Sequence, residues 1–171
     1  MQIIFIMFIL YIVCSSQITE IFYRDNKCTE GNEHKFFIYL EEEFMQNSTH
    51  VIQVKEEQHI IKELDKCTLD FNGGSILSKG YVNKKINKKM CGINIYNGNA
   101  CDELKKKIVI YLDSMCIKNK GGYGMVLCNE KQTLFYDCAD EFCKNCEIIQ
   151  TEVHKKKCEK TELGYTNYFS N

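Results

Sequence analysis

The segment Ile108-Val109-Ile110-Tyr111-Leu112 repeats the pattern of an earlier segment, Phe36-Phe37-Ile38-Tyr39-Leu40, and an acidic residue follows each. Both consist of β-branched, aromatic and aliphatic residues, which favour β-strands. If they are equivalent strands, Tyr39 and Tyr111 must point to corresponding sides of their sheets, because a one-residue slip reverses the face of every side chain. The pair predicts a β fold with a tandem repeat. A chance match in a chain rich in tyrosine and lysine is the alternative.

The match extends beyond these two segments. Tyr23-Arg-Asp-Asn-Lys-Cys28 and Tyr96-Asn-Gly-Asn-Ala-Cys101 share a five-residue step from tyrosine to cysteine. Further along, a cysteine precedes a pair of glycines twice. This pattern predicts repeats at 20–91 and 93–128, followed by a cysteine-rich tail at 129–171. The spacing differs by one residue, and we expect the loop 29–35 to absorb it.

Other short segments rich in Ile, Val, Phe and Tyr are also expected to be strands, and Gly73-Gly74 and Gly121-Gly122 to be turns between strands. Two segments have helical features. Residues 56–66 place Ile60, Ile61 and Leu64 on one helical face, and 101–107 begins with acidic residues. We therefore expect a mainly β, small disulfide-rich domain with one or two short helices. The further expected strands are 50–54, 93–96 and 133–136.

Residues 3–13 form an unbroken apolar run that ends at Cys14-Ser15-Ser16. Such a run before small residues is typical of a secretory signal peptide. As a helix it covers roughly 16 Å, less than the ~30 Å core of a bilayer. We expect a signal peptide at 1–16, cleavage after Ser16, and a secreted domain at 17–171 with no membrane span.

Of the eleven cysteines, Cys14 lies in the expected signal peptide, which leaves ten. An even and dense set in a secreted chain is typical of a disulfide framework. Three cysteines in one repeat cannot all pair within it, so at least one bridge must leave each repeat. Spacing alone selects no connectivity. The expected disulfide cysteines are Cys28, Cys67, Cys91, Cys101, Cys116, Cys128, Cys138, Cys143, Cys146 and Cys158.

The charge and composition of the chain indicate which kinds of partner it can bind. The formal net charge is −1 and Arg24 is the only basic residue besides lysine, so the sequence indicates no nucleic-acid partner. The lysine clusters at 84–89, 105–107 and 155–157 would bind an anionic glycan if the fold brought them onto one face. Scattered solvated lysines are the alternative. Asn47-Ser48-Thr49 is a sequon, and we expect glycosylation at Asn47.

The tail contains residues of the types that bind zinc at Cys138, Cys143, Cys146, His154 and Cys158. Their spacing is shorter than that of usual zinc fingers, and a secreted chain favours disulfides. Cys143-Lys144-Asn145-Cys146 has the spacing of a redox motif but not its βαβ setting. We therefore assign no metal ligand and no cofactor.

Motifs of hydrolases and phosphate-binding loops are missing from the sequence. Glu41-Glu42-Glu43 and Asp102-Glu103 would supply a glycosidase acid and base only if the fold brought them together. The histidines lie among lysines and carboxylates, which favours solvated positions. No catalytic residue is assigned. The histidines are His34, His50, His59 and His154.

The stretch Ile21-Phe22-Tyr23-Arg24-Asp25-Asn26-Lys27-Cys28 resembles the start of small secreted cysteine-rich proteins of amoebal protists, in which an aromatic pair precedes a cysteine. The resemblance covers 21–31 and its echo near Tyr96. It implies secretion and β structure, and it implies no activity or functional residue.

These features predict a secreted, non-catalytic binding module for a glycan, a cell surface or a protein, because a disulfide framework can present binding loops without any further motif. Two alternatives stay open. One is a small secreted hydrolase or hydrolase inhibitor. The other is a component of an extracellular coat or matrix that is cross-linked by intermolecular disulfides.

Overall fold

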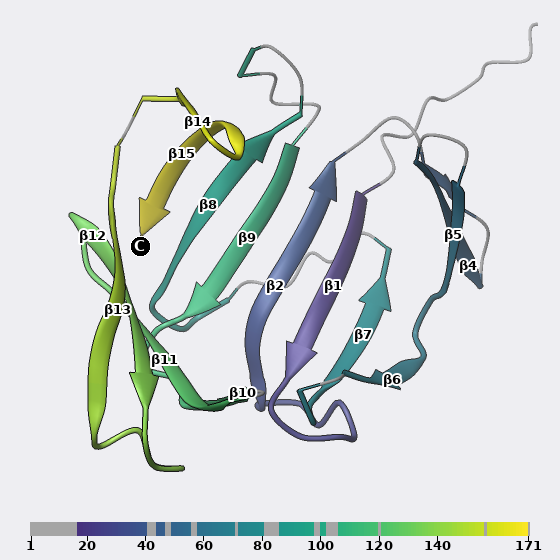
Figure 1. Cartoon of the computed structure of the whole chain (residues 1–171). Helices are drawn as coiled ribbons and strands as arrows, with labels where there is room; N and C mark the ends of the chain where they lie inside the picture. Colours follow the sequence, from purple (N-terminus) through teal and green to yellow (C-terminus); the bar gives the residue numbers. More distant parts are fainter. Residues whose placement is uncertain are drawn as a thin grey trace, which may run out of the picture.

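The computed structural model in Figure 1 contains fifteen β-strands and no helix among the residues that it describes. The mainly β, disulfide-rich fold predicted from the sequence is confirmed. The expected signal peptide at 1–16 and the sequon residue Asn47 lie outside the described residues. The described residues are 17–40, 44–46, 49–55, 58–70, 72–80, 86–97, 100–101, 106–119, 121–155 and 157–170.

Eight strands form one large antiparallel sheet, which occupies the centre of Figure 1. The strands are β1 (Gln17–Tyr23), β2 (Glu33–Leu40), β6 (Cys67–Leu69), β7 (Ser75–Lys79), β8 (Met90–Tyr96), β9 (Lys106–Leu112), β14 (Glu159–Thr161) and β15 (Gly164–Ser170). Their order across the sheet is β14-β15-β8-β9-β2-β1-β7-β6, which places β2 beside β9 at the middle.

Two smaller antiparallel sheets flank the large one on opposite sides of Figure 1. The first lies in the chain between β2 and β6, and the second lies between β9 and β14. The first consists of β3 (Phe44–Gln46), β4 (His50–Lys55) and β5 (Gln58–Glu63), and the second of β10 (Ile117–Asn119), β11 (Gly122–Cys128), β12 (Gln132–Cys138) and β13 (Cys146–Val153).

All five predicted strand segments are strands, whereas the helix expected over 56–66 is wrong. Residues 58–63 form β5, which pairs with β4 along its full length. The backbone N–H and C=O groups of β5 form hydrogen bonds with β4. The spacing of apolar residues within one segment does not reveal such a partner strand. Ile61, expected on a buried helical face, is 63% exposed. Of the second expected helix, 102–105 lie outside the described residues, and Lys106 and Lys107 belong to β9.

The two halves of the large sheet share one strand order and one register. β1 lies between β2 and β7, as β8 lies between β9 and β15. Phe22 pairs with Lys35 in the first half, and Ile95 pairs with Lys107 in the second. Phe22 and Ile95 are equivalent, because each directly precedes the tyrosine of the Tyr-to-Cys step.

The one-residue spacing difference falls inside the segment predicted to absorb it. Phe22 pairs with Lys35, but Tyr23 pairs with Glu33, so the register shifts past His34. This is a β-bulge, which accommodates one extra residue without disturbing the pairing beyond it. The register of the adjoining strand therefore stays the same as in the second half.

Tyr39 and Tyr111 lie on the same face of the large sheet, as the repeat predicts. In the β2–β9 pair, Tyr39 is opposite Lys107 and Lys35 is opposite Tyr111. Directly opposed residues project to one face, and alternation adds Phe37 to it. We call this side of the large sheet the Lys35 face.

The correspondence continues beyond the expected repeat limits. The disulfide Cys28–Cys67 joins the residue five positions after Tyr23 to outer strand β6, and Cys101–Cys158 joins the residue five positions after Tyr96 to the residue before β14. The matching strands thus span 17–79 and 90–170. The small sheets are insertions at equivalent points of the two halves, and the tail belongs to the second half.

Five disulfides use all ten cysteines that follow Cys14. Cys91–Cys128 crosses between the two predicted repeats, and two bridges lead from the second repeat to the tail, as the counting argument requires. Each bridge contributes about 2–4 kcal/mol by restricting the unfolded chain. Such a framework is typical of extracellular and secretory-pathway proteins. The bridges are Cys28–Cys67, Cys91–Cys128, Cys101–Cys158, Cys116–Cys143 and Cys138–Cys146.

Buried apolar side chains lie on both faces of the large sheet. On the side opposite the Lys35 face, the core is Ile21, Tyr23, Phe36, Ile110 and Leu112. On the Lys35 face, two clusters connect the large sheet to the insertions. Ile18 packs with Tyr39 and Leu64 beside the three-stranded sheet, and Cys91 packs with Val126, Cys128, Tyr111 and Phe135 beside the four-stranded sheet. Both insertions therefore contact the same face.

Gly92 lies where β8 packs closely against Val109 and Phe169. A Cβ atom there would lie 2.4 Å from the Val109 carbonyl oxygen and 2.6 Å from Cζ of Phe169. We expect Gly92→Ala to lower the free energy of unfolding by about 2–3 kcal/mol, because backbone cannot move aside. At Gly121 the added Cβ meets nothing within 4 Å, so Gly121→Ala should change it by less than about 0.5 kcal/mol. Denaturant unfolding with intact disulfides measures both, and equal effects would contradict the packing.

Candidate functional site

The cysteines considered as zinc ligands or redox groups are all bridged. The Sγ atoms of Cys138, Cys143 and Cys146 lie within 4.8 Å of one another, but each belongs to a disulfide, Cys143 to Cys116 and the other two to each other. Cys158 is bonded to Cys101. Cysteine binds zinc as a thiolate, so these cysteines in their bridged form contribute stability and are not metal ligands.

The carboxylates considered for an acid and a base, at 41–43 and 102–103, lie outside the described residues. Of the histidines, the side chain of His59 also lies outside them. His50 is partly exposed, with Nε2 3.9 Å from Glu63. The expectation of a solvated position is wrong for His34, which is half-buried at the β-bulge with its ring edge-on to Phe22.

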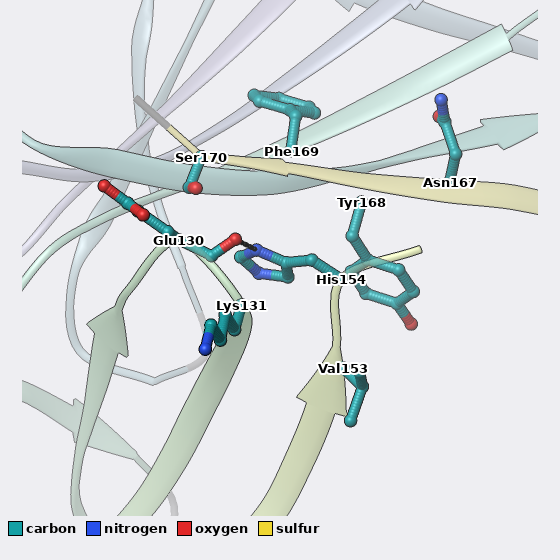
Figure 2. Close-up of a pocket in the computed structure, with 8 residues that line it drawn as sticks. All are labelled: Glu130, Lys131, Val153, His154, Asn167, Tyr168, Phe169 and Ser170. Carbon is teal, nitrogen blue, oxygen red and sulfur yellow. Dashed lines mark hydrogen bonds between the residues drawn. The ribbon is translucent and has the colours of Figure 1, made fainter. Parts of the chain in front are cut away.

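His154 lines an open hollow of about 880 Å³ at one end of the four-stranded sheet (Figure 2). Its Nδ1 lies 3.3 Å from the Glu130 carbonyl oxygen, and its Nε2 lies 2.8 Å from Oγ1 of Thr133. A carbonyl only accepts, so the neutral ring donates from Nδ1 and accepts at Nε2. Its ring also stacks on Tyr168. With both nitrogens engaged, His154 is held as a structural group.

The Lys35 face carries a different arrangement, between the two insertions. The ammonium groups of Lys35 and Lys107 lie 4.3 and 4.0 Å from the centroid of the Phe37 ring. Lys35 also lies 5.5 Å from the Tyr111 ring, and Lys107 lies 5.4 Å from that of Tyr39. These distances are typical of cation–π contacts. All five side chains are neither fully buried nor fully exposed.

Register explains why two lysines meet there. Lys35 and Lys107 hold equivalent positions in the two halves, and the antiparallel β2–β9 pair places both on one face with Phe37 between them. Only Lys107 belongs to a cluster seen in the sequence. Lys35 belongs to none of these clusters, because no other lysine lies near it in the chain, so the pair could be found only by pairing the two repeats.

The electrostatic surroundings of Lys35 differ from those of an ordinary surface lysine. Burial lowers the pKa of Lys35, the charge of Lys107 lowers it further, and Asp70 acts in the opposite direction. No described carboxylate forms an ion pair with Lys35. By contrast, Lys62 pairs with buried Glu20, which also accepts a hydrogen bond from Tyr39 at 3.0 Å. Lys35 and Lys107 thus form a concentrated positive charge over an aromatic floor.

The other predicted lysine clusters do not join this pair in the described part of the chain. Lys89 lies 3.8 Å from Asp113, and Lys155 contacts Glu159. Residues 84, 85, 105 and 156 lie outside the described residues. We therefore define the candidate site as the Lys35 cluster: Lys35, Phe37, Tyr39, Lys107 and Tyr111.

The chain was compared with protein families and individual proteins. No family model, curated protein or solved structure matches it. The described residues contain no helix that is long and apolar enough to cross a membrane.

His34 should make stability depend on pH. Burial, together with the charges of Lys35 and Arg24, lowers its pKa from 6.5 to about 4 in the folded protein. As the pH falls, His34 binds a proton in the unfolded chain before it does so in the folded protein. The contribution of His34 to the free energy of unfolding is therefore fully present above pH 6.5 and is lost as the pH falls towards 4. Over that range the wild type should lose about 2–3 kcal/mol more than His34→Gln. Urea unfolding at several pH values measures this. Lys118→Gln, at an exposed position of β10 whose side chain stays charged over this pH range, is the control and should follow the wild type.

Proposed function

We propose that the protein is an extracellular binding module that recognises an anionic glycan through the Lys35 cluster. The observation that carries the proposal is the meeting of Lys35 and Lys107 over the Phe37 ring. Two ammonium groups in a partly desolvated place repel each other, and a sulfate or carboxylate between them relieves that repulsion. Charge-assisted hydrogen bonds to such a group are stronger than neutral ones.

The aromatic floor supports a sugar as the carrier of the negative charge. The rings of Phe37, Tyr39 and Tyr111 lie within 5.5 Å of the two ammonium groups. The C–H face of a sugar ring packs on such surface, because both are apolar, while its charged substituents reach the lysines. A free inorganic anion would use the lysines alone, whereas an anionic sugar uses both features.

The disulfides support a soluble module over a cross-linked coat. All ten cysteines in 17–171 are closed in intramolecular bridges, so none remains to join another chain. The bridges and the paired strands on both sides of the cluster hold the backbone of its lysines in place. Less side-chain freedom is then lost on binding, which favours affinity.

Binding of a heparin-derived hexasaccharide tests the proposal, with uncharged maltohexaose as the matched sugar. Calorimetry should detect the heparin fragment and no maltohexaose, and the affinity should fall with added salt. Replacing both lysines, Lys35→Gln with Lys107→Gln, should weaken binding at least ~10-fold through loss of two charge-assisted contacts. This variant should fold, because it removes a like-charge pair.

The control is a second double variant, Lys118→Gln with Lys160→Gln, which changes the net charge equally at two exposed lysines on β10 and β14. It should change affinity less than about twofold, the size of a general charge effect. Equal losses in both double variants would show scattered surface attraction and overturn the proposal. An unchanged affinity after loss of Lys35 and Lys107 would also overturn it. Phe37→Leu should weaken the hexasaccharide and leave inorganic sulfate binding unchanged.

A further inference from the structure

A second cavity lies between the large sheet and the four-stranded sheet, separate from the hollow in Figure 2. Its volume is about 190 Å³, slightly more than the ~150 Å³ cavity that holds a benzene molecule. Tyr168 lines both spaces. Most of the wall is apolar and comes from β8, β9 and β12, with Ile93, Ile95, Val109 and Phe135 among its residues.

The polar end of this cavity consists of Gln150 and Glu152 on β13, with Tyr168 facing them from β15. The Tyr168 hydroxyl donates to Oε2 of Glu152 at 2.8 Å, and Nε2 of Gln150 donates to Oε1 at 2.5 Å. Burial and the Glu152 carboxylate raise the pKa of Tyr168. The phenol therefore stays protonated and keeps its proton directed at Glu152.

Most of the hydrogen-bonding sites that are still unused at this end of the cavity are acceptor sites. A carboxylate can accept about four hydrogen bonds, and Glu152 receives one at each oxygen from these partners. The amide oxygen of Gln150 is also an acceptor. The hydroxyl proton of Tyr168 and one Gln150 N–H are already directed at Glu152. One N–H of Gln150, whose side chain is exposed, is the donor that remains on these three side chains. A ligand that uses the free acceptor sites of Glu152 brings donors, and a positive charge complements the carboxylate.

We propose that this cavity binds a small amphipathic cation, a primary amine attached to one aromatic or aliphatic ring. The ring lies between Ile93, Val109 and Phe135, and the ammonium group donates to Glu152. Most small-ligand sites share this composition of apolar walls with a few placed polar groups. The cavity shares Tyr111 with the Lys35 cluster, but Lys35 and Lys107 do not line it, and the proposed cation depends on Glu152, which is not part of that cluster.

Phenethylamine is the probe, and 3-phenylpropionate, with the same ring and the opposite charge, is the matched comparison. In an NMR titration of the disulfide-intact protein, phenethylamine should shift backbone amide signals of β8, β12 and β13 around the cavity. The carboxylate compound should bind at least ~10-fold more weakly, because it places a negative charge beside Glu152. Shifts confined to other surfaces, or equal binding of the two compounds, would overturn the proposal.

Glu152→Gln removes the charge and keeps an acceptor for Tyr168. It should weaken phenethylamine binding at least ~5-fold, as expected for loss of a charge-assisted hydrogen bond, and should reduce the preference over 3-phenylpropionate. Glu147→Gln, at an exposed position of the same strand, should leave both affinities unchanged. The pKa of Tyr168 can be compared between the wild type and Glu152→Gln without ligand, and loss of the Glu152 charge should lower this pKa. If that pKa falls while phenethylamine affinity stays at the wild-type value, the contact is structural and the proposal is wrong.

Discussion

The antiparallel pairing of β2 with β9 is the constraint on which the rest of the molecule depends. Each half of the large sheet is a four-stranded unit, and this pairing joins them at their inner edges. An unpaired central edge would expose a row of backbone donors and acceptors, which promotes association with other chains. Joining the halves satisfies those groups and produces one continuous eight-stranded sheet.

Antiparallel pairing of equivalent strands also determines where equivalent side chains lie. The two halves are related by rotation about an axis perpendicular to the sheet, so a residue and its counterpart project from the same face. Lys35 and Lys107 meet for this reason, and Tyr39 and Tyr111 accompany them. The same relation places both insertions on the Lys35 face, because each begins after an equivalent strand.

The insertions give the two halves different chemistry. The three-stranded insertion is connected to the large sheet by a small cluster around Ile18 and by the Glu20–Lys62 ion pair. The four-stranded insertion has the Cys91–Cys128 bridge and the Tyr111–Phe135 contact, and it forms one side of a partly open cavity with the Glu152 carboxylate at one end. Tyr111 belongs to both proposed sites, with Lys35 near its ring and its side chain in the cavity wall.

The sequence by itself determined the β class, five of the strand segments, the even set of disulfide cysteines and the equivalence of Tyr39 with Tyr111. These features depend on residue type, two-residue alternation and parity, which are properties of the chain that need no spatial partner. Tertiary structure alone decided the partner of each cysteine, the true extent of the two halves and the strand at 58–63, because each depends on contacts between distant segments. The two proposed sites also depend on contacts between distant segments. Lys35 and Lys107 are far apart in the chain, and Glu152 is an ordinary acidic residue until β15 places Tyr168 against it.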